Sequence, residues 1–115
     1  MNILIEKIEN DVTLISLEGS MDTAGVQAID NRFAFATSTA AKKIVVDLSE
    51  VTFLASIGIG TILGGAQSQK RRGGKLVLLN PKKQIVQEVL VRTRINEIIE
   101  IYNDLESARR AFESL

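Results

Sequence analysis

One serine stands where a buried strand is predicted to pass into a helix. Ser56 lies in the stretch 43–65, after the β-branched run of residues 44–46 and a short connection, and it precedes Gly58 and Gly60. The first N–H groups of a helix have no acceptor within the helix, and the helix dipole places partial positive charge there. A hydroxyl at this place can cap the helix, and a phosphate on it would add about −1.5 to −2 charges in a favourable anion site. The residues themselves leave both interpretations open, a structural cap and a phosphorylation switch.

The presence of two glycines in the first turns of the predicted helix requires a physical explanation. Each glycine inside a helix costs about 1 kcal/mol relative to alanine. Gly58 and Gly60 therefore indicate either close packing or a partner that approaches the backbone. They do not form the dinucleotide motif GxGxxG, because the next glycine, Gly64, comes one residue late, and no P-loop lysine follows. We therefore expect no nucleotide and no other cofactor.

Composition narrows the possible functions. The chain of 115 residues has no cysteine and no histidine, which excludes a Ser-His-Asp triad and cysteine metal sites. We therefore expect a protein that is not an enzyme. The N-terminus, residues 1–10, contains two glutamates and no long apolar core, and no apolar run approaches the ~20 residues that a membrane span needs. The sequence predicts a cytoplasmic protein without a membrane span.

Charge is balanced overall but uneven along the chain. Fourteen basic residues match fourteen acidic residues, yet residues 70–94 hold eight basic residues and one acidic residue, Glu88. This run is typical of solvated helix faces, and the alternative is a docking surface for an acidic protein. Nucleic acid is not an expected partner, because the run has no aromatic residue that could stack on a base.

Strand and helix patterns alternate along the chain. Two β-branched runs around Asn10 and Asp11 predict a β-hairpin, and Asp22 or Thr23 is predicted to cap the next helix. From there on helices and strands alternate, which predicts an α/β fold with a mixed, mostly parallel sheet in one domain, residues 1–115. The predicted order is β-β-α-β-α-β-α-β-α, with strands at 3–9, 12–18, 44–46, 75–79 and 97–102 and helices beginning near 22, 57, 80 and 103.

Four local expectations accompany this order. Residues 51–54 are predicted to be a short connection between a strand and a helix. Asn80, ahead of a proline, is predicted to cap the third helix. Asn103 and Glu106 are predicted to form a capping box at the last helix. Gln69 is expected on the polar face of the second helix.

The stretch DLSEVTFLASIGIGTILGG, residues 47–65, resembles the signature of STAS domains, and most closely that of bacterial anti-sigma factor antagonists. Those proteins carry a strand ending in Asp-Leu, a link ending in aromatic-apolar-Asp-Ser, then Gly-apolar-Gly and an apolar helix. Residues 19–22 resemble the family's Gly-x-apolar-Asp, and residues 73–76 and 80–81 also agree with its pattern. The resemblance covers nearly the whole chain.

The resemblance implies regulation by partner switching. In that scheme the unphosphorylated antagonist binds an anti-sigma factor that is also a serine kinase. The kinase phosphorylates a serine of the antagonist, and the phosphorylated antagonist is released. A phosphatase then removes the phosphate and restores the antagonist. The phosphoacceptor matches Ser56, and the acid after the second strand matches Asp22. The partner-binding surface implied here consists of Asp22, Ala55, Ser56, Ile57, Gly58, Ile59 and Gly60.

Two positions depart from the family pattern. Ala55 replaces the acid before the serine, and Ile57 replaces the small or hydroxyl residue after it. The alternative is therefore a STAS scaffold or accessory subunit of a stress-signalling or lipid-transport complex, without phosphorylation. A small hydrolase is a third and less favoured class, because it would need a base near Ser56 and the chain has no histidine.

Overall fold

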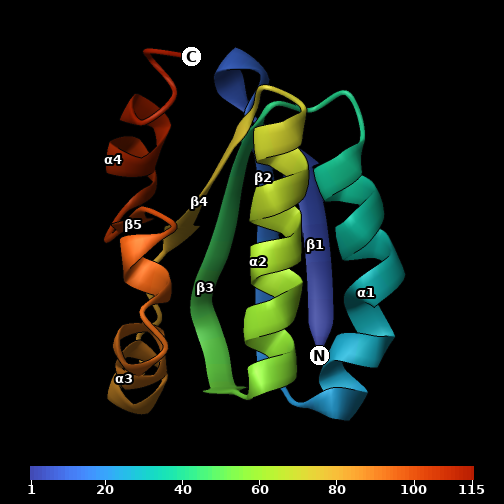
Figure 1. The fold of residues 1–115 in the computed structure, drawn as a ribbon, viewed down its shortest axis with the longest axis vertical. Coiled ribbons are helices and arrows are strands. Elements are labelled where there is room, and N and C mark those ends of the chain that lie inside the picture. The colour runs from blue at the N-terminus through green and yellow to red at the C-terminus, as the bar shows by residue number, and fades with distance from the viewer.

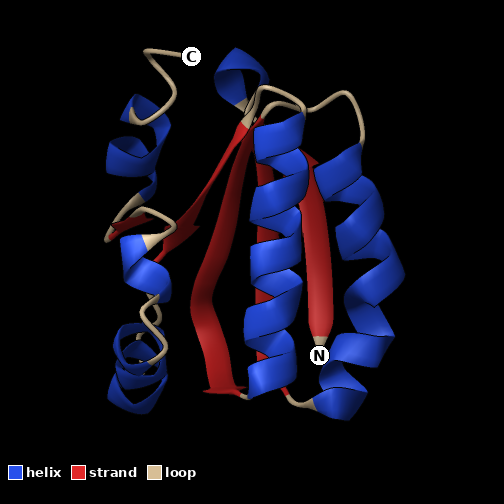
Figure 2. Cartoon of the chain, viewed as in Figure 1, coloured by secondary structure: helices blue, strands red, loops and turns tan.

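Five strands form one mixed sheet in the computed structural model, which describes residues 1–115 (Figures 1 and 2). The strand order is β1-β2-β3-β4-β5, with β1 antiparallel to β2 and every other neighbouring pair parallel. The carboxyl ends of the parallel strands therefore lie at one edge of the sheet. The strands are β1 (Asn2–Lys7), β2 (Thr13–Met21), β3 (Lys43–Leu54), β4 (Lys75–Leu79) and β5 (Ile101–Tyr102).

Three α-helices connect consecutive strands from β2 to β5 and a fourth follows β5, so the predicted order and the α/β prediction are confirmed. In Figure 1, α1 and α2 run side by side in front of the sheet. None of the helices combines the length and the apolar character that crossing a bilayer requires. The helices are α1 (Thr23–Ser38), α2 (Ser56–Arg71), α3 (Gln84–Arg92) and α4 (Leu105–Arg110), with short 3-10 turns η1 (Glu9–Asp11) and η2 (Ile95–Glu97).

Apolar side chains fill both faces of the sheet. The larger core cluster has 20 buried residues and joins the sheet to α1, α2 and α3, and a cluster of 6 joins it to α4. Side chains alternate between the faces along β3, so Ile44 and Val46 belong to the larger cluster and Val45 to the smaller one. Each such fully buried side chain stabilises the fold by about 1.5–3 kcal/mol. This core holds β3 rigidly up to the helix that follows it.

β3 is longer than predicted, because residues 51–54 continue the strand instead of forming a connection. Residues 51, 53 and 54 pair with Gly19, Ser20 and Met21 of β2, with one register irregularity before these pairs and a second between Gly19 and Ser20. β2 itself extends through Gly19, whose φ of +110° lies in the region that favours glycine. Pairing between distant segments thus extends both strands to the edge of the sheet.

Three helix-capping and boundary predictions were wrong. Asn80 does not cap α3, which begins at Gln84, after Lys83. The backbone N–H of Asn80 donates to the Tyr102 carbonyl, and this bond holds Asn80 beside β5. β5 contains only two residues, because residues 95–97 form the turn η2. Asp104 caps α4 by accepting the Ser107 N–H at 2.8 Å, in place of a capping box.

The position of Gln69 also differs from its prediction. Its side chain is fully buried between α1 and α2, where Nε2 donates to the Thr37 carbonyl at 2.6 Å. The neighbouring Ser68 hydroxyl donates to the same carbonyl at 3.2 Å. Two polar side chains thus bond the last turn of α1 to α2, an interaction that helical periodicity does not reveal.

Candidate functional site: the junction of β3 and α2

The carboxyl ends of β2 and β3 meet where α2 begins. β3 ends at Leu54, and Ala55 is the extended N-cap residue of α2, with φ −94° and ψ 169°. The N–H of Ala55 donates to the Met21 carbonyl at 3.1 Å. This bond joins the start of α2 to the end of β2, and so places the junction beside the segment that carries Asp22.

Ser56 is the first residue of α2, and its hydroxyl does not cap the helix. The Ala55 carbonyl instead accepts the N–H groups of Gly58 and Ile59, at 2.9 and 3.2 Å. The N–H groups of Ser56 and Ile57 have no backbone acceptor. The interpretation of Ser56 as a structural cap is therefore wrong, and an exposed hydroxyl stands next to two unpaired helix-terminal amides.

Asp22 is the N-cap of α1, so of the two predicted candidates the structure selects Asp22 and not Thr23. Its Oδ1 accepts the Gly25 N–H at 2.7 Å and its Oδ2 accepts the Ser20 hydroxyl at 3.1 Å. The bond from the Gly25 amide is the main reason why the pKa of Asp22 lies below its ordinary value, and the Ser20 hydroxyl adds to the effect. Both bonds favour the charged form, so Asp22 carries a full negative charge near neutral pH.

The two glycines of the α2 start have different physical roles. A Cβ at Gly58 would lie 2.8 Å from Leu54 Cδ1 and 2.9 Å from Met21 Cβ, so this glycine lets α2 pack against the strand ends. A Cβ at Gly60 would meet no heavy atom within 4 Å. Close packing therefore explains Gly58, whereas Gly60 leaves an open strip of backbone on the surface.

The structure separates the seven predicted partner-binding residues by exposure. Asp22, Ser56, Ile57 and Gly60 are exposed, Ala55 is half-buried, and Gly58 and Ile59 are buried. A partner can touch the first four directly. The buried pair supports the exposed residues from below, because Ile59 belongs to the larger core cluster.

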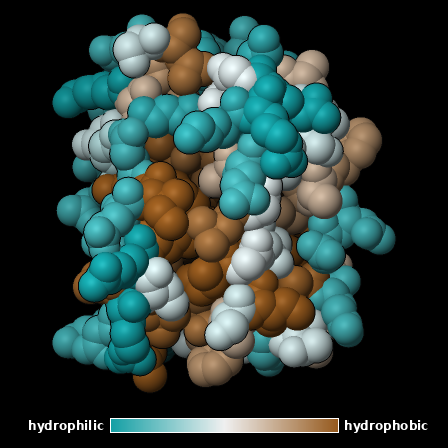
Figure 3. Space-filling view, viewed as in Figure 1, coloured by the Kyte–Doolittle hydropathy of each residue, from teal (hydrophilic) through white to brown (hydrophobic).

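Two further features of this surface were not singled out as site residues from the sequence. Phe53, at the end of β3, exposes 49% of its surface although it is aromatic. A groove of about 590 Å³ between α1 and α2 begins at Ile57 and continues past Gly60 and Gly64. In Figure 3 a pale strip of surface runs where α2 lies, with brown apolar areas beside it. The aromatic position in the signature was the one signal that could have indicated Phe53.

The fold and this site together define a small α/β domain that presents an exposed serine at a strand-to-helix junction. The sequence profile of the STAS domain matches residues 2–108. The chain belongs to the STAS domain family.

Individual relatives agree with this assignment. The chain is 25% identical over 114 residues to BtrV of Bordetella bronchiseptica, which is provisionally named an anti-sigma factor antagonist, and the match covers 99% of this chain and 97% of BtrV. An anti-sigma factor antagonist from Mycobacterium paratuberculosis has a similar fold, with a TM-score of 0.85, 20% identity and coverage of 96% of this chain and 92% of that one. A STAS domain protein from Planctomyces limnophilus has a TM-score of 0.81 and 26% identity, with 95% of each chain covered.

Proposed function

We propose that residues 1–115 act as one STAS domain that serves as a cytoplasmic anti-sigma factor antagonist, a binding module without enzymatic activity. The names of BtrV and of the Mycobacterium paratuberculosis protein support this function. Its partner is an anti-sigma factor that is also a serine kinase, and a phosphatase reverses the modification. No nucleic acid is needed for this activity.

The observation that carries the proposal is the state of Ser56. Its hydroxyl is exposed and makes no hydrogen bond that phosphorylation would break. The unpaired N–H groups of Ser56 and Ile57 can donate to a phosphate on that hydroxyl, and the helix dipole favours its charge. The modification therefore leaves the fold intact and changes the charge of the surface.

The docking surface consists of Asp22, Phe53, Ser56, Ile57 and Gly60. Ile57 exposes 40% of its surface and supplies apolar contact, whereas Gly60 allows the partner to approach the helix backbone. A phosphate on Ser56 adds about −1.5 to −2 charges beside these groups. Bringing that charge into an interface costs desolvation, and an acidic partner surface adds repulsion, so phosphorylation releases the partner.

Substitution of Ser56 tests the switch. Ser56→Asp is expected to weaken partner binding and Ser56→Ala to preserve it. Partners are captured from native cells with both variants and identified by mass spectrometry. The matched control is Ser114→Asp, which adds one negative charge at an exposed C-terminal position. A partner captured equally by all variants would refute the switch. Phosphopeptide mass spectrometry after incubation with the captured kinase then shows whether Ser56 is modified.

A second candidate function follows from Ala55 and Ile57, which replace the acid and the small residue of the family pattern. We propose as the alternative a STAS scaffold or accessory subunit that binds its partner constitutively, in a stress-signalling or lipid-transport complex. A stable complex that contains unmodified Ser56, together with equal binding by Ser56→Asp, would favour this alternative.

A further inference from the structure

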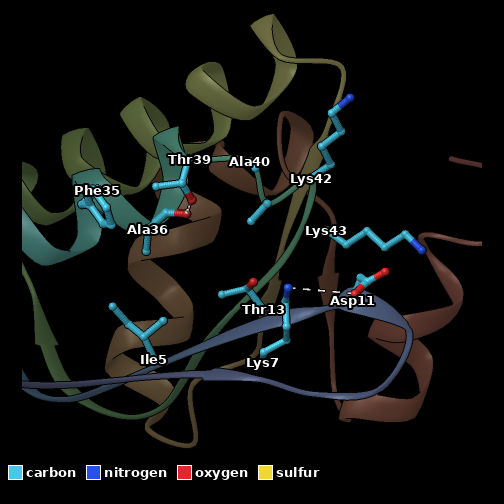
Figure 4. A pocket seen from close by; sticks show the side chains of 11 residues that line it. Ile5, Lys7, Asp11, Thr13, Phe35, Ala36, Thr39, Ala40, Lys42 and Lys43 are labelled. Atoms are coloured by element: carbon cyan, nitrogen blue, oxygen red, sulfur yellow. Dashed lines mark hydrogen bonds and ion pairs between the residues drawn. The ribbon is translucent and has the colours of Figure 1, made fainter.

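A groove lies beside β1 at the end of the molecule where α1 ends (Figures 1 and 4). It has a volume of about 800 Å³ and runs between β1 and the C-terminal half of α1. Ile5 of β1 and Phe35 of α1 line it from opposite sides, and Phe35 exposes 72% of its surface. None of the residues that line it belongs to the docking surface around Ser56. Ser56 begins α2, whereas the groove lies where α1 ends, beside the other end of that helix, whose 16 residues span about 24 Å.

Positive charge dominates the rim of the groove. Lys7, Lys42 and Lys43 line it, and the single acidic residue among the lining residues is Asp11, 4.0 Å from Lys7. Lys42 and Lys43 have no carboxylate within 4 Å. The three basic residues 70–72 at the end of α2 also have no carboxylate within 4 Å. They lie near this rim, because the Lys75 N–H donates to the Lys42 carbonyl in the adjoining loop. A carboxylate-bearing ligand would complement this end of the molecule.

β1 supplies an unpaired strand edge along the same groove. In an antiparallel pair, alternate residues direct their backbone N–H and C=O groups to the partner strand and away from it. The Ile8 N–H donates to the Val12 carbonyl across the hairpin, whereas the Ile3 carbonyl accepts the Arg32 side chain at 3.3 Å from outside it. The odd-numbered residues Ile5 and Lys7 therefore direct their backbone groups outward, where no strand is paired.

We propose that this groove binds an extended acidic segment of another protein, which adds to the sheet as a strand beside β1. Its backbone pairs with the outward groups of Ile5 and Lys7. Apolar side chains on one face of the segment contact Phe35. Its carboxylates lie near Lys42 and Lys43, where they form charge-assisted contacts.

An extended acidic peptide fits these features better than other anionic partners do. A bilayer is broad and flat, and it offers no donors or acceptors in register with a strand edge. Single-stranded nucleic acid could stack on Phe35, but its backbone has no N–H groups to donate to the outward carbonyls of β1. Only a peptide complements the edge, the apolar wall and the cations together.

Amide-resolved NMR on the ¹⁵N-labelled full chain tests the proposal. The probe is the peptide acetyl-Asp-Glu-Asp-Val-Thr-Val-Thr-amide, with a control in which lysine replaces its three acids. We expect the acidic probe to shift amide signals in β1 and residues 35–43 and to slow hydrogen exchange at Ile5 and Lys7. Slowed exchange there is specific to strand pairing, because simple charge attraction does not protect an amide.

Variants at exposed positions sharpen the test without touching the core. Lys42→Glu and Phe35→Ala are each expected to weaken binding of the probe about fivefold, and the matched control Lys83→Glu to leave it unchanged. Ser56→Asp is expected to bind the probe like the wild type, so the result is independent of the proposed function.

Four outcomes would overturn the proposal. These are the absence of shifts at millimolar probe, shifts that cluster around Ser56, shifts without protection of Ile5 and Lys7, and equal binding of the lysine peptide. The same NMR titration with phosphatidylglycerol vesicles and with an oligothymidine strand covers the other anionic partners. Binding of either of these in preference to the acidic peptide would also refute it.

Discussion

Alanine at Gly58 and alanine at Gly60 are expected to change stability in opposite directions. Both substitutions remove the helix-propensity cost of glycine, which favours the folded state by about 1 kcal/mol. At Gly58 the added methyl group would lie 2.8 Å from Leu54 Cδ1 and 2.9 Å from Met21 Cβ, whereas at Gly60 it would meet nothing within 4 Å. The two positions are two residues apart in one helix and differ in packing alone.

The contacts at Gly58 set the size of the effect. Leu54 Cδ1 can rotate away, but Met21 Cβ is fixed by its backbone, and Met21 is fully buried. Overpacking of this kind costs about 1–3 kcal/mol, and a contact that cannot relax belongs in the upper part of that range. After the gain in propensity, Gly58→Ala is expected to lower the free energy of unfolding by about 1–2 kcal/mol. Gly60→Ala is expected to raise it by about 0.5–1 kcal/mol.

Urea unfolding followed by far-ultraviolet circular dichroism measures both changes. For a chain of 115 residues, each 1 kcal/mol shifts the melting temperature by about 4 °C, so thermal scans should separate the variants by roughly 6–12 °C. The wild type is the reference, and equal m-values would show that the unfolding transition is the same. If Gly58→Ala were as stable as Gly60→Ala, the conclusion that α2 packs against the ends of β2 and β3 through Gly58 would be wrong.

Three other predictions follow from local contacts. The lowered pKa of Asp22 stabilises the fold above its unfolded pKa of about 3.9, and this contribution disappears as pH falls through the folded pKa. The stability difference between the wild type and Asp22→Asn in urea titrations should thus be largest near pH 7 and should shrink as the pH falls below about 3.9. Glu100→Gln should lower the raised pKa of Tyr102, the only tyrosine, towards about 10 in a phenolate absorbance titration. Gly25→Ala should lower the free energy of unfolding in urea by about 3 kcal/mol or more, because the added Cβ would overlap the Ser20 carbonyl oxygen. An unchanged urea midpoint would contradict this packing.

Local periodicity was sufficient to predict most of the fold. The helical spacing of Val26, Ile29, Phe33 and Ala36 predicted the inner face of α1, and all four side chains are buried. The alternation of helix and strand patterns predicted the order of elements and the mixed sheet, because consecutive strands joined by helices pair in parallel. These features depend on neighbours within one or two turns, which the sequence shows directly.

The ends of elements could not be predicted in this way. Residues 51–54 belong to β3 because β2, about 30 residues earlier, supplies the pairing partners. Asn80 does not cap α3 because its amide bonds to Tyr102 in β5. In both cases a segment far along the chain competes with the local preference, and the long-range hydrogen bonds prevail.

The sequence by itself determined that this protein is a STAS-like α/β domain with a serine at a strand-to-helix junction, because pattern and motif are local properties. Only the tertiary structure decided that Ser56 lies inside the first turn with a free hydroxyl. It also decided that Met21 occupies the space beside Gly58, whereas the space beside Gly60 is empty. The reason is that exposure and packing at the junction depend on where the end of β2 lies. The hydrogen bond that holds the end of β2 beside the start of α2 joins Ala55 and Met21, which are 34 positions apart in the sequence.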